Sequence, residues 1–242
     1  NGSQNVYQIG ITTNCSINLS AKSLSLCGKI ENTPDVNVSE MDARMSLSVM
    51  FGDVSLKSFG FDFNTPNTSC YDICIYPYNA TYNISAKIEY GDKTVYTDRK
   101  YYIPLMTISN TSRIINLYHL EVNFTTVILA FVYDKSTGQR IQDAYIKILR
   151  YYPENASDSA IEYQTVEVEK TDVNGETLAK VRANDIWYKF MVEYPAGTVL
   201  LNTEVAKITS TEKPLPVSLS SGNLLEYNQI LALNSDVSCN FL

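Results

Sequence analysis

Apolar and polar residues alternate with a period of two along most of the chain, which is the pattern of β-strands that bury one face. Turn residues such as Gly52-Asp53 and Gly91-Asp92 interrupt the alternation at the short spacings typical of a β-sandwich. Helical periodicity is limited to a short turn at 224–233. The sequence therefore predicts an all-β fold, with strands over residues 15–21, 45–51, 59–63, 82–90, 95–102, 144–148, 162–171, 178–182 and 186–194.

The length of 242 residues suits two domains of about 100–120 residues, each able to bury a core. We predict one sandwich over residues 1–118 and a second over 119–215, with residues 104–119 as a bridge. The C-terminal segment, 216–242, is expected to donate a strand to a neighbour or to start a further domain. Residues 124–133 form a nearly continuous apolar run, which predicts a strand buried on both faces.

Turn motifs in the second unit carry a family resemblance. They are an Asp-x-x-Thr-Gly-type turn at Asp134–Gly138, the pair Asp143-Ala144 opening the next strand, and a Thr-Asp-x-x-Gly-type turn ending at Gly175. Over residues 120–210 the chain resembles the carboxypeptidase regulatory-like domains, also called transthyretin-like or Cna-B-like, although the family usually has glycine at the position of Asp143. The resemblance implies a seven-stranded immunoglobulin-like sandwich, and therefore two immunoglobulin-like β-sandwich domains in tandem.

The same resemblance bears on cross-linking and on the host. Some family members form a Lys–Asn isopeptide bond from a lysine on the first strand, but residues 130–133 contain no lysine, so no such bond is expected. Tandem domains rich in sequons and tyrosine are similar to glycosylated surface and appendage proteins of archaea. Eukaryotic surface proteins also carry sequons and stay an alternative.

Ten of the 21 asparagines begin an Asn-x-Ser/Thr triplet without proline, whereas 43 serines and threonines would give roughly four by chance. Such acceptors are used only on exported chains, and an attached glycan points into solvent. The sequence therefore predicts an extracellular protein whose covalent N-linked glycans are its only added groups, without a cofactor. The predicted sites are Asn1, Asn14, Asn18, Asn37, Asn67, Asn79, Asn83, Asn110, Asn123 and Asn155.

The sequons also predict which faces point outward. Asn83 has the opposite strand parity to Ile84 and Ala86, and Asn14 and Asn18 have the opposite parity to Cys15 and Ile17. Residues 156–242 contain seven asparagines and no sequon. We take this as a hypothesis that the later strands of the second domain face partner subunits.

Five cysteines favour the same oxidising compartment. Four of them, Cys15, Cys27, Cys70 and Cys74, allow three pairings, of which local bridges 15–27 and 70–74 are preferred. Cys239 has no partner among these four cysteines. It either pairs with a cysteine beyond this sequence or in a neighbouring molecule, or is buried as a free thiol. A zinc site is not expected, because the spacing is Cys-x-x-x-Cys and His119 is the only histidine.

Charge and hydropathy exclude two classes of partner. With 19 basic and 26 acidic residues, the net charge of −7 and the lack of a basic stripe argue against nucleic acid. The longest apolar run, residues 127–133, is far shorter than the roughly 20 residues of a membrane-spanning helix. Because the first residues do not form a signal peptide, we expect a processed part of a longer precursor.

Candidate chemistry is sparse. His119 has no nucleophile motif to serve, so a structural role is favoured. Asp172-Val173-Asn174-Gly175 matches the start of a calcium loop but lacks the rest, which favours a hairpin turn. The carboxylate pairs Glu40/Asp42 and Glu167/Glu169 are interpreted as solvated faces. Tyrosines and a half-exposed Trp187 are a weaker candidate for a sugar-binding platform.

We therefore expect a non-enzymatic structural glycoprotein without catalytic or metal-binding residues. The leading hypothesis is a subunit of a filament, sheath or surface layer that polymerises with copies of itself. Strand addition by residues 7–11 or 224–233 is the expected mode of assembly. The alternative is an adhesin or receptor-binding stalk module, whose exposed tyrosines or loops would bind a glycan or protein ligand.

Overall fold

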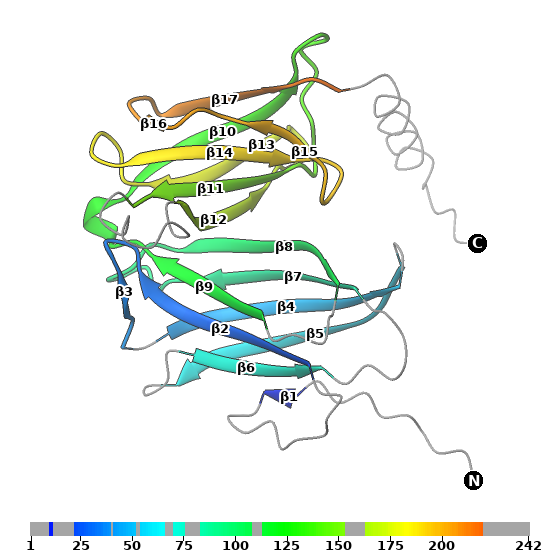
Figure 1. Cartoon of the computed structure of the whole chain (residues 1–242), viewed down its shortest axis with the longest axis vertical. Coiled ribbons are helices and arrows are strands. Elements are labelled where there is room, and N and C mark those ends of the chain that lie inside the picture. The colour runs from blue at the N-terminus through cyan, green and yellow to red at the C-terminus, as the bar shows by residue number, and fades with distance from the viewer. Residues whose placement is uncertain are drawn as a thin grey trace, which may run out of the picture.

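The computed structural model describes residues 10–11, 22–39, 41–51, 54–65, 70–75, 83–107, 113–152 and 163–219 (Figure 1). Their regular elements are strands and one short 3-10 helix, so the predicted all-β fold is confirmed. The first half of the chain forms β1 (Gly10–Ile11), β2 (Lys22–Ile30), β3 (Thr33–Asn37), β4 (Met41–Phe51), β5 (Val54–Thr65), β6 (Cys70–Ile75), β7 (Asn83–Tyr90), β8 (Arg99–Thr107) and β9 (Arg113–His119). The second half forms η1 (Val122–Phe124), β10 (Thr126–Asp134), β11 (Tyr145–Tyr151), β12 (Tyr163–Lys170), β13 (Glu176–Val181), β14 (Trp187–Glu193), β15 (Val199–Asn202), β16 (Ala206–Lys207) and β17 (Glu212–Val217).

The first sandwich packs two sheets face to face. One contains β1, β6, β2 and β3 in that order, and β9 pairs in parallel with β2. The other is the antiparallel run β8, β7, β4 and β5. Their inward side chains, such as Leu26, Met45, Leu47, Ile84 and Ile88, are fully buried and form one core.

The second sandwich has a smaller sheet of β13, β10 and β17 against a larger one of β15, β14, β11 and β12, with β16 also pairing with β14. Its core is separate from the first and contains Ile128, Ile146, Val166, Phe190 and Leu215. Alternate residues along the strands point inward, as the sequence pattern predicts.

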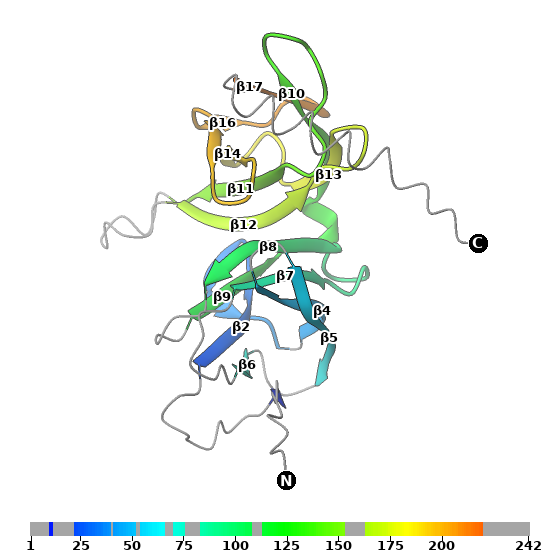
Figure 2. The same cartoon turned by 90° about the vertical axis from the view of Figure 1, so that its right-hand side faces the viewer.

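The two sandwiches share a sheet. Strand β12 of the second lies parallel to β8 of the first, with Val168 opposite Tyr101, which makes one nine-stranded sheet through both units. Figures 1 and 2 show the sandwiches stacked along the long axis of the molecule with β8 and β12 at the contact. We call this contact the joint.

Two predictions about the middle of the chain are wrong. Residues 104–119 do not bridge the units, because they contribute the end of β8 and the whole of β9 to the first sandwich. The run at 124–133 is not buried on both faces: β10 buries Ile128, Ala130 and Val132, whereas Val127 on its other face is 49% exposed. Among the described residues, no second sheet packs on the outer face of the smaller sheet.

Aspartates organise the turns of the resembling region. Asp134 accepts hydrogen bonds from the hydroxyl groups of Ser136 and Thr137, at 2.7 and 2.8 Å. Asp172 accepts hydrogen bonds from the N–H groups of Asn174 and Glu176, at 2.8 and 3.0 Å, so this segment is a turn, as predicted. It does not close a hairpin, because β12 pairs with β11 and β8 whereas β13 pairs with β10 in the other sheet.

The two edge strands of the smaller sheet, β17 and β13, differ in the hydrogen-bond donors that they expose. Among the residues that the structure describes, β17 pairs with β10 alone, and Pro214 and Pro216 lack an N–H group. Prolines at alternating positions remove donors from the same side of a strand, so this edge offers few hydrogen-bond donors to another chain. At the opposite edge, the N–H of Lys180 on β13 donates to the Glu167 carboxylate at 2.8 Å.

Candidate functional site: the buried charged joint

A buried carboxylate from the first sandwich lies at the centre of the joint. Glu31 occupies the turn between β2 and β3 and is 0% exposed. It accepts hydrogen bonds from Arg99, from Arg150 at 3.2 Å and from the Tyr188 hydroxyl at 2.8 Å. Its backbone carbonyl accepts the Tyr152 hydroxyl at 2.9 Å. Glu31 therefore connects β8 with β11, β14 and the residue after β11.

Arg99, the first residue of β8, also links the two sandwiches. Besides Glu31 it donates to the carbonyl oxygens of Tyr118 at 2.9 Å and Lys180 at 2.6 Å, and its Nε lies 4.0 Å from the Glu167 carboxylate. Burial opposes the guanidinium charge, but Glu31 and Glu167 outweigh it, so the pKa of Arg99 lies above its ordinary value. The charge of Arg99 is thus fixed inside the joint.

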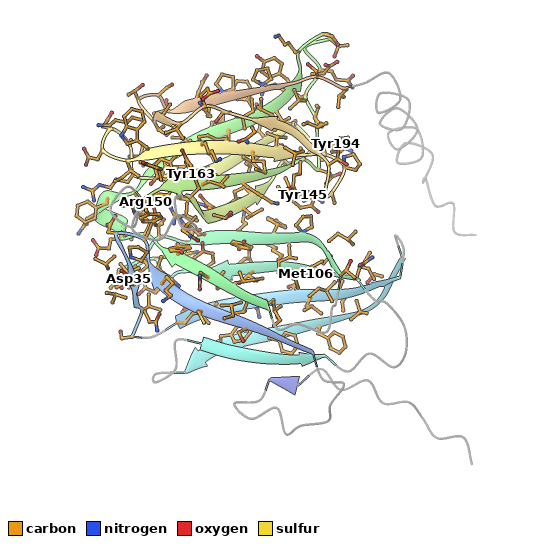
Figure 3. All side chains as sticks on the ribbon, viewed as in Figure 1. Asp35, Met106, Tyr145, Arg150, Tyr163 and Tyr194 are labelled. Carbon is orange, nitrogen blue, oxygen red and sulfur yellow. The ribbon has the colours of Figure 1, made fainter. Side chains whose placement is uncertain are left out.

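Tyrosine hydroxyls and Arg150 extend the network across the contact. The Tyr90 hydroxyl on β7 donates to the carbonyl oxygen of Val166 on β12 at 2.9 Å. The Tyr118 hydroxyl donates to Gln164 at 3.3 Å. Arg150 on β11 lies at the level of the joint in Figure 3 and also donates to Asn32 at 3.0 Å. Because buried polar groups are strongly stabilised only when paired, this network ties the two sandwiches into one body.

The carboxylate pair Glu167/Glu169 is buried and not solvated, which corrects the interpretation from sequence. Both residues are 0% exposed, on the same face of β12. Glu169 accepts the Thr177 hydroxyl at 3.1 Å and lies 3.7 Å from the Lys100 ammonium. Burial raises the pKa of both carboxyl groups. The pair bridges β12, β8 and β13.

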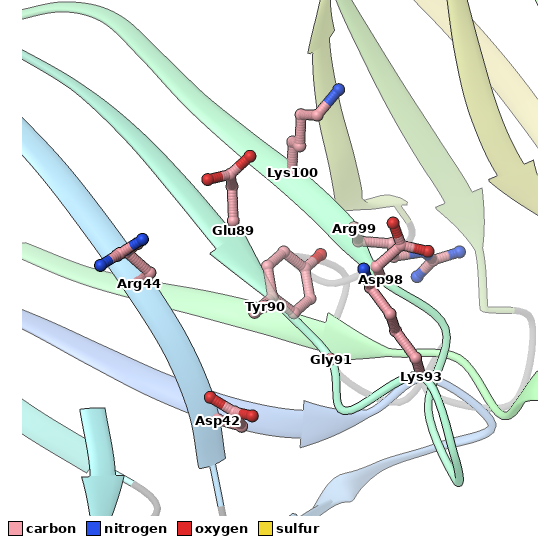
Figure 4. Close-up of a pocket in the computed structure, with 9 residues that line it drawn as sticks. All are labelled: Asp42, Arg44, Glu89, Tyr90, Gly91, Lys93, Asp98, Arg99 and Lys100. Carbon is pink, nitrogen blue, oxygen red and sulfur yellow. The ribbon is translucent and has the colours of Figure 1, made fainter. Parts of the chain in front are cut away.

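A shallow pocket opens beside the joint in the first sandwich (Figure 4). Its volume is about 300 Å³, and charged side chains of both signs line it: Asp42, Glu89 and Asp98 with Arg44, Lys93 and Lys100. Arg44 and Lys100 already pair with Asp62 and Glu169. Asp42, the member of the second carboxylate pair that the structure describes, is exposed at this rim. The mixed lining gives the pocket no preference for an anion or a cation.

His119 is structural, as predicted, but it is not in a linker. It ends β9, is 1% exposed, and its ring meets the rings of Tyr90 and Tyr96 edge-on at 5.0 and 5.2 Å. Neither ring nitrogen has a hydrogen-bond partner among the described residues. Burial, together with the nearby Arg99 charge, lowers the pKa of His119 to about 4.

This pKa gives a testable pH dependence. Because the folded pKa lies below the ordinary 6.5, the folded state binds fewer protons than the unfolded state in acid, and stability falls as pH drops from 6.5 through about 4. We expect His119→Phe to remove up to about 3 kcal/mol of this acid-induced loss while staying close to wild type at pH 7. Urea unfolding of both proteins at pH 7 and pH 4 measures the difference. Equal acid losses in the two proteins would contradict the assignment.

Three predicted glycosylation sites lie in described residues, and none is buried. Asn37 on β3 and Asn123 in η1 are exposed. Asn83 is half-buried on the outer face of β7, opposite in parity to the buried Ile84, and its amide oxygen accepts the Thr107 hydroxyl at 2.8 Å. That bond leaves the amide nitrogen, the atom that carries a glycan, outside the contact. The other seven sites lie outside the described residues: Asn1, Asn14, Asn18, Asn67, Asn79, Asn110 and Asn155.

The strand register disagrees with one predicted cysteine pair. Cys70 and Cys74 are four residues apart on the single strand β6, which separates their Cα atoms by about 13 Å. A disulfide spans roughly 4.4–6.8 Å, so a Cys70–Cys74 bridge does not fit this strand. The register places Cys27 of β2 directly opposite Cys70 instead. Cys15 and Cys239 lie outside the described residues.

Trp187 is 45% exposed, as predicted, and Lys207 lies over its ring at 5.7 Å. Among the described residues, no helix is long and apolar enough to cross a membrane. In the same residues, no group of three or more histidine, cysteine or acidic side chains is arranged to hold a metal ion.

Sequence reasoning missed Glu31, Arg99 and Arg150. No motif marks them, because each belongs to a different strand or turn and they meet only through the packing of the two sandwiches. The segment 166–169 did carry a signal. Valines alternate with glutamates there, so an isolated strand would bury only its valine face. A strand that lies between two units buries both faces, and residues 166–169 are all buried.

No family model matches the chain, and no curated protein does so either. Among solved structures, the shaft pilin SpaA from Lactobacillus rhamnosus GG is 10% identical with a TM-score of 0.31, over 84% of this chain and 98% of the pilin. A streptococcal ancillary pilin is 11% identical with a TM-score of 0.31, over 84% of this chain and 63% of that one. The pilus adhesin RrgA from Streptococcus pneumoniae is 10% identical with a TM-score of 0.27, over 76% and 30% of the two chains. Scores this low do not place the chain in a family.

Proposed function

We propose that this chain is a non-enzymatic, extracellular structural glycoprotein, the subunit of a filament, sheath or surface layer. The observation that carries the proposal is the joint: the β8–β12 strand pair and a buried ionic network connect the two sandwiches. Rigidity across domains serves a protein that transmits load or spans distance, whereas hinged domains are the default. The buried glutamates and arginines are committed to this structural network.

The glycoprotein part of the proposal rests on the sequons. Ten acceptors are far above chance, and Asn37, Asn83 and Asn123 lie on accessible positions. Glycans on outward faces hydrate the surface and discourage edge-to-edge pairing of a strand-rich chain. Partner contacts would then use the sequon-free residues 156–242.

For assembly we propose strand addition between copies. Part of the N-terminal candidate segment, β1, pairs with β6 of its own chain through Gly10 and Ile11. The other candidate, residues 224–233, lies outside the described residues. The proline-bearing edge of β17 is a poor acceptor, so the acceptor is expected at another sheet edge.

Electron microscopy of the native material tests the proposal. We expect filaments or sheets, and we expect Ile9→Asp or Leu231→Asp to disperse them into folded monomers, because a charge on the buried face of an added strand is unfavourable. Gln8→Asp is the matched control, because residue 8 is adjacent to Ile9 and its side chain would point to the opposite face of such a strand. Monodisperse particles in native material would rule out the structural-subunit proposal. Filaments that survive both substitutions would rule out strand addition through these segments alone.

Two narrower proposals concern covalent structure and family. We propose a Cys27–Cys70 bridge, since residues directly opposite on antiparallel strands have Cα separations of about 4.5–5.5 Å, within disulfide range. The Asp134 and Asp172 turns support the resemblance to carboxypeptidase regulatory-like domains, and the proposed similarity to archaeal surface proteins rests on the sequons and tyrosines.

A second function has a specific observation in its favour. Aromatic rings and lysines gather on the outer face of the second sandwich, where Lys189 lies 4.0 Å from the Tyr163 ring and Tyr151 stacks obliquely at 5.3 Å. With Trp187 and Lys207 this face suits a sugar or protein ligand. We therefore keep an adhesin or receptor-binding stalk as the alternative, which ligand binding by the monomer would favour.

A further inference from the structure

The carboxyl groups of Glu167 and Glu169 in the joint each have an oxygen atom without a hydrogen-bond partner among the described residues. Both side chains are fully buried on one face of β12. Each uses Oε2 for its hydrogen bond: Glu167 accepts the Lys180 N–H at 2.8 Å, and Glu169 accepts the Thr177 hydroxyl at 3.1 Å. The Oε1 atom of each is buried without a partner among the described residues. An ionised carboxylate only accepts, so two ionised groups cannot satisfy each other.

One shared proton gives both unpartnered oxygen atoms a hydrogen bond. The two side chains are two residues apart on one buried face of β12, where side chains at alternate positions are neighbours. Protonation of one turns its acceptor oxygen into a donor, and a single O–H···O bond then occupies both unpartnered atoms. Buried carboxyl pairs that are close together characteristically share a proton in this way, because two adjacent negative charges are unfavourable in a low dielectric.

The charges that face the pair do not remove the need for the proton. From β8, Arg99 Nε lies 4.0 Å from Glu167 and Lys100 Nζ lies 3.7 Å from Glu169. Arg99 is shared with Glu31, which Arg150 also approaches at 3.2 Å. From β13 come the Lys180 backbone and side chain and the Thr177 hydroxyl, and from β7 the neutral Tyr90 hydroxyl. Burial is the larger influence and raises the pKa of Glu167 to about 8 despite the Arg99 charge.

We propose that Glu167 and Glu169 form a proton-binding site that holds one proton between them at neutral pH, and that releasing it loosens the joint. Between the ordinary carboxyl range and the raised value, the folded state binds more protons than the unfolded state, so stability falls as pH rises through this window. The carboxyl pair therefore contributes most to the stability of the joint in mild acid and least in alkali, independently of any assembly, and this contribution is opposite in sign to that of His119.

The first test compares thermal unfolding of wild type and Glu169→Gln between pH 5 and pH 9. The glutamine amide donates a hydrogen bond at every pH, so it mimics the protonated state. We expect the melting temperature of wild type to fall by about 10 °C relative to the variant across this range, with the His119 contribution cancelling in the comparison. Glu89→Gln, an exposed glutamate on β7, is the matched control and should follow wild type. Parallel curves for wild type and Glu169→Gln would overturn the proposal.

The second test does not depend on the variant folding. Infrared spectra of the wild-type protein at pH 7 should contain a protonated-carboxyl carbonyl band of about one group per chain, because ordinary carboxyl groups are ionised at that pH. The band should disappear in alkali together with the loss of stability. Its absence at pH 7 would overturn the proposal. Both readouts use the monomer, so their outcome is separate from that of the filament experiment.

Discussion

Arg99→Met is expected to destabilise the protein by about 3–5 kcal/mol, among the largest effects of any single substitution here. The guanidinium connects Glu31 with the backbone carbonyls of Tyr118 and Lys180, and it lies beside Glu167. Methionine fills much of the space but leaves two buried carboxyl groups with fewer partners. Denaturant unfolding measures the loss, and we also expect one cooperative transition to separate into two as the sandwiches uncouple.

Arg44→Met is the matched control. Arg44 also pairs with a carboxylate, Asp62, at 2.9 Å, but both side chains are largely exposed, and exposed pairs contribute only about 0–1 kcal/mol. A double variant, Arg99→Met with Glu31→Leu, should lose less than the sum of its single changes, because the two groups belong to one network. A loss for Arg99→Met no larger than that for Arg44→Met would show that the network is not what holds the sandwiches together.

Gly91→Ala is expected to cost about 3 kcal/mol or more, because backbone strain and a steric clash act together at this position. Gly91 follows β7 with a φ of +104°, where non-glycine residues are strained, and an added Cβ would lie 2.2 Å from the carbonyl oxygen of Thr97. That oxygen belongs to the backbone of the loop that leads into Arg99, so relief of the clash displaces the joint. Thermal and denaturant unfolding test the expected loss.

Two other glycines separate the contributions. Gly138 has a φ of +73°, and an added Cβ there would have no neighbour within 4 Å, so Gly138→Ala should show the backbone strain alone, about 1 kcal/mol. Gly60 has neither a positive φ nor a neighbour within 4 Å, so Gly60→Ala should lie within about 0.5 kcal/mol of wild type or stabilise slightly. Similar effects at all three positions would refute the steric explanation.

The fold was accessible from sequence because its signals are local. Alternation along 82–90 identified the buried face of β7, and the aspartates and glycines at 134–138 and 172–175 marked turns that the structure contains. β10 was misjudged because apolar content alone does not separate a strand buried on both faces from one whose second face is merely half-covered. The extent of β8 and β9 was missed because their residues read as a linker.

The joint was not accessible from sequence, for a different physical reason. Glu31 and Arg99 are 68 residues apart, and Glu31 and Tyr188 are 157 apart. Their pairing depends on how one sandwich is placed on the other, which strand periodicity does not encode. A charged residue on an amphipathic strand ordinarily points to solvent, and Glu167 and Glu169 depart from that expectation because β13 of their own sandwich and β8 of the other both contact them.

The unbroken sheet through β12 and β8 has a geometric consequence at larger scale. Neighbouring strands rotate by about 20–25° in a fixed hand, and here that rotation accumulates from β15 in one sandwich to β5 in the other. The two ends of the molecule are therefore offset by an angle about the long axis. Copies joined end to end would each add the same offset. Such a row would wind into a helix whose pitch is determined inside the subunit as well as at the contacts between subunits.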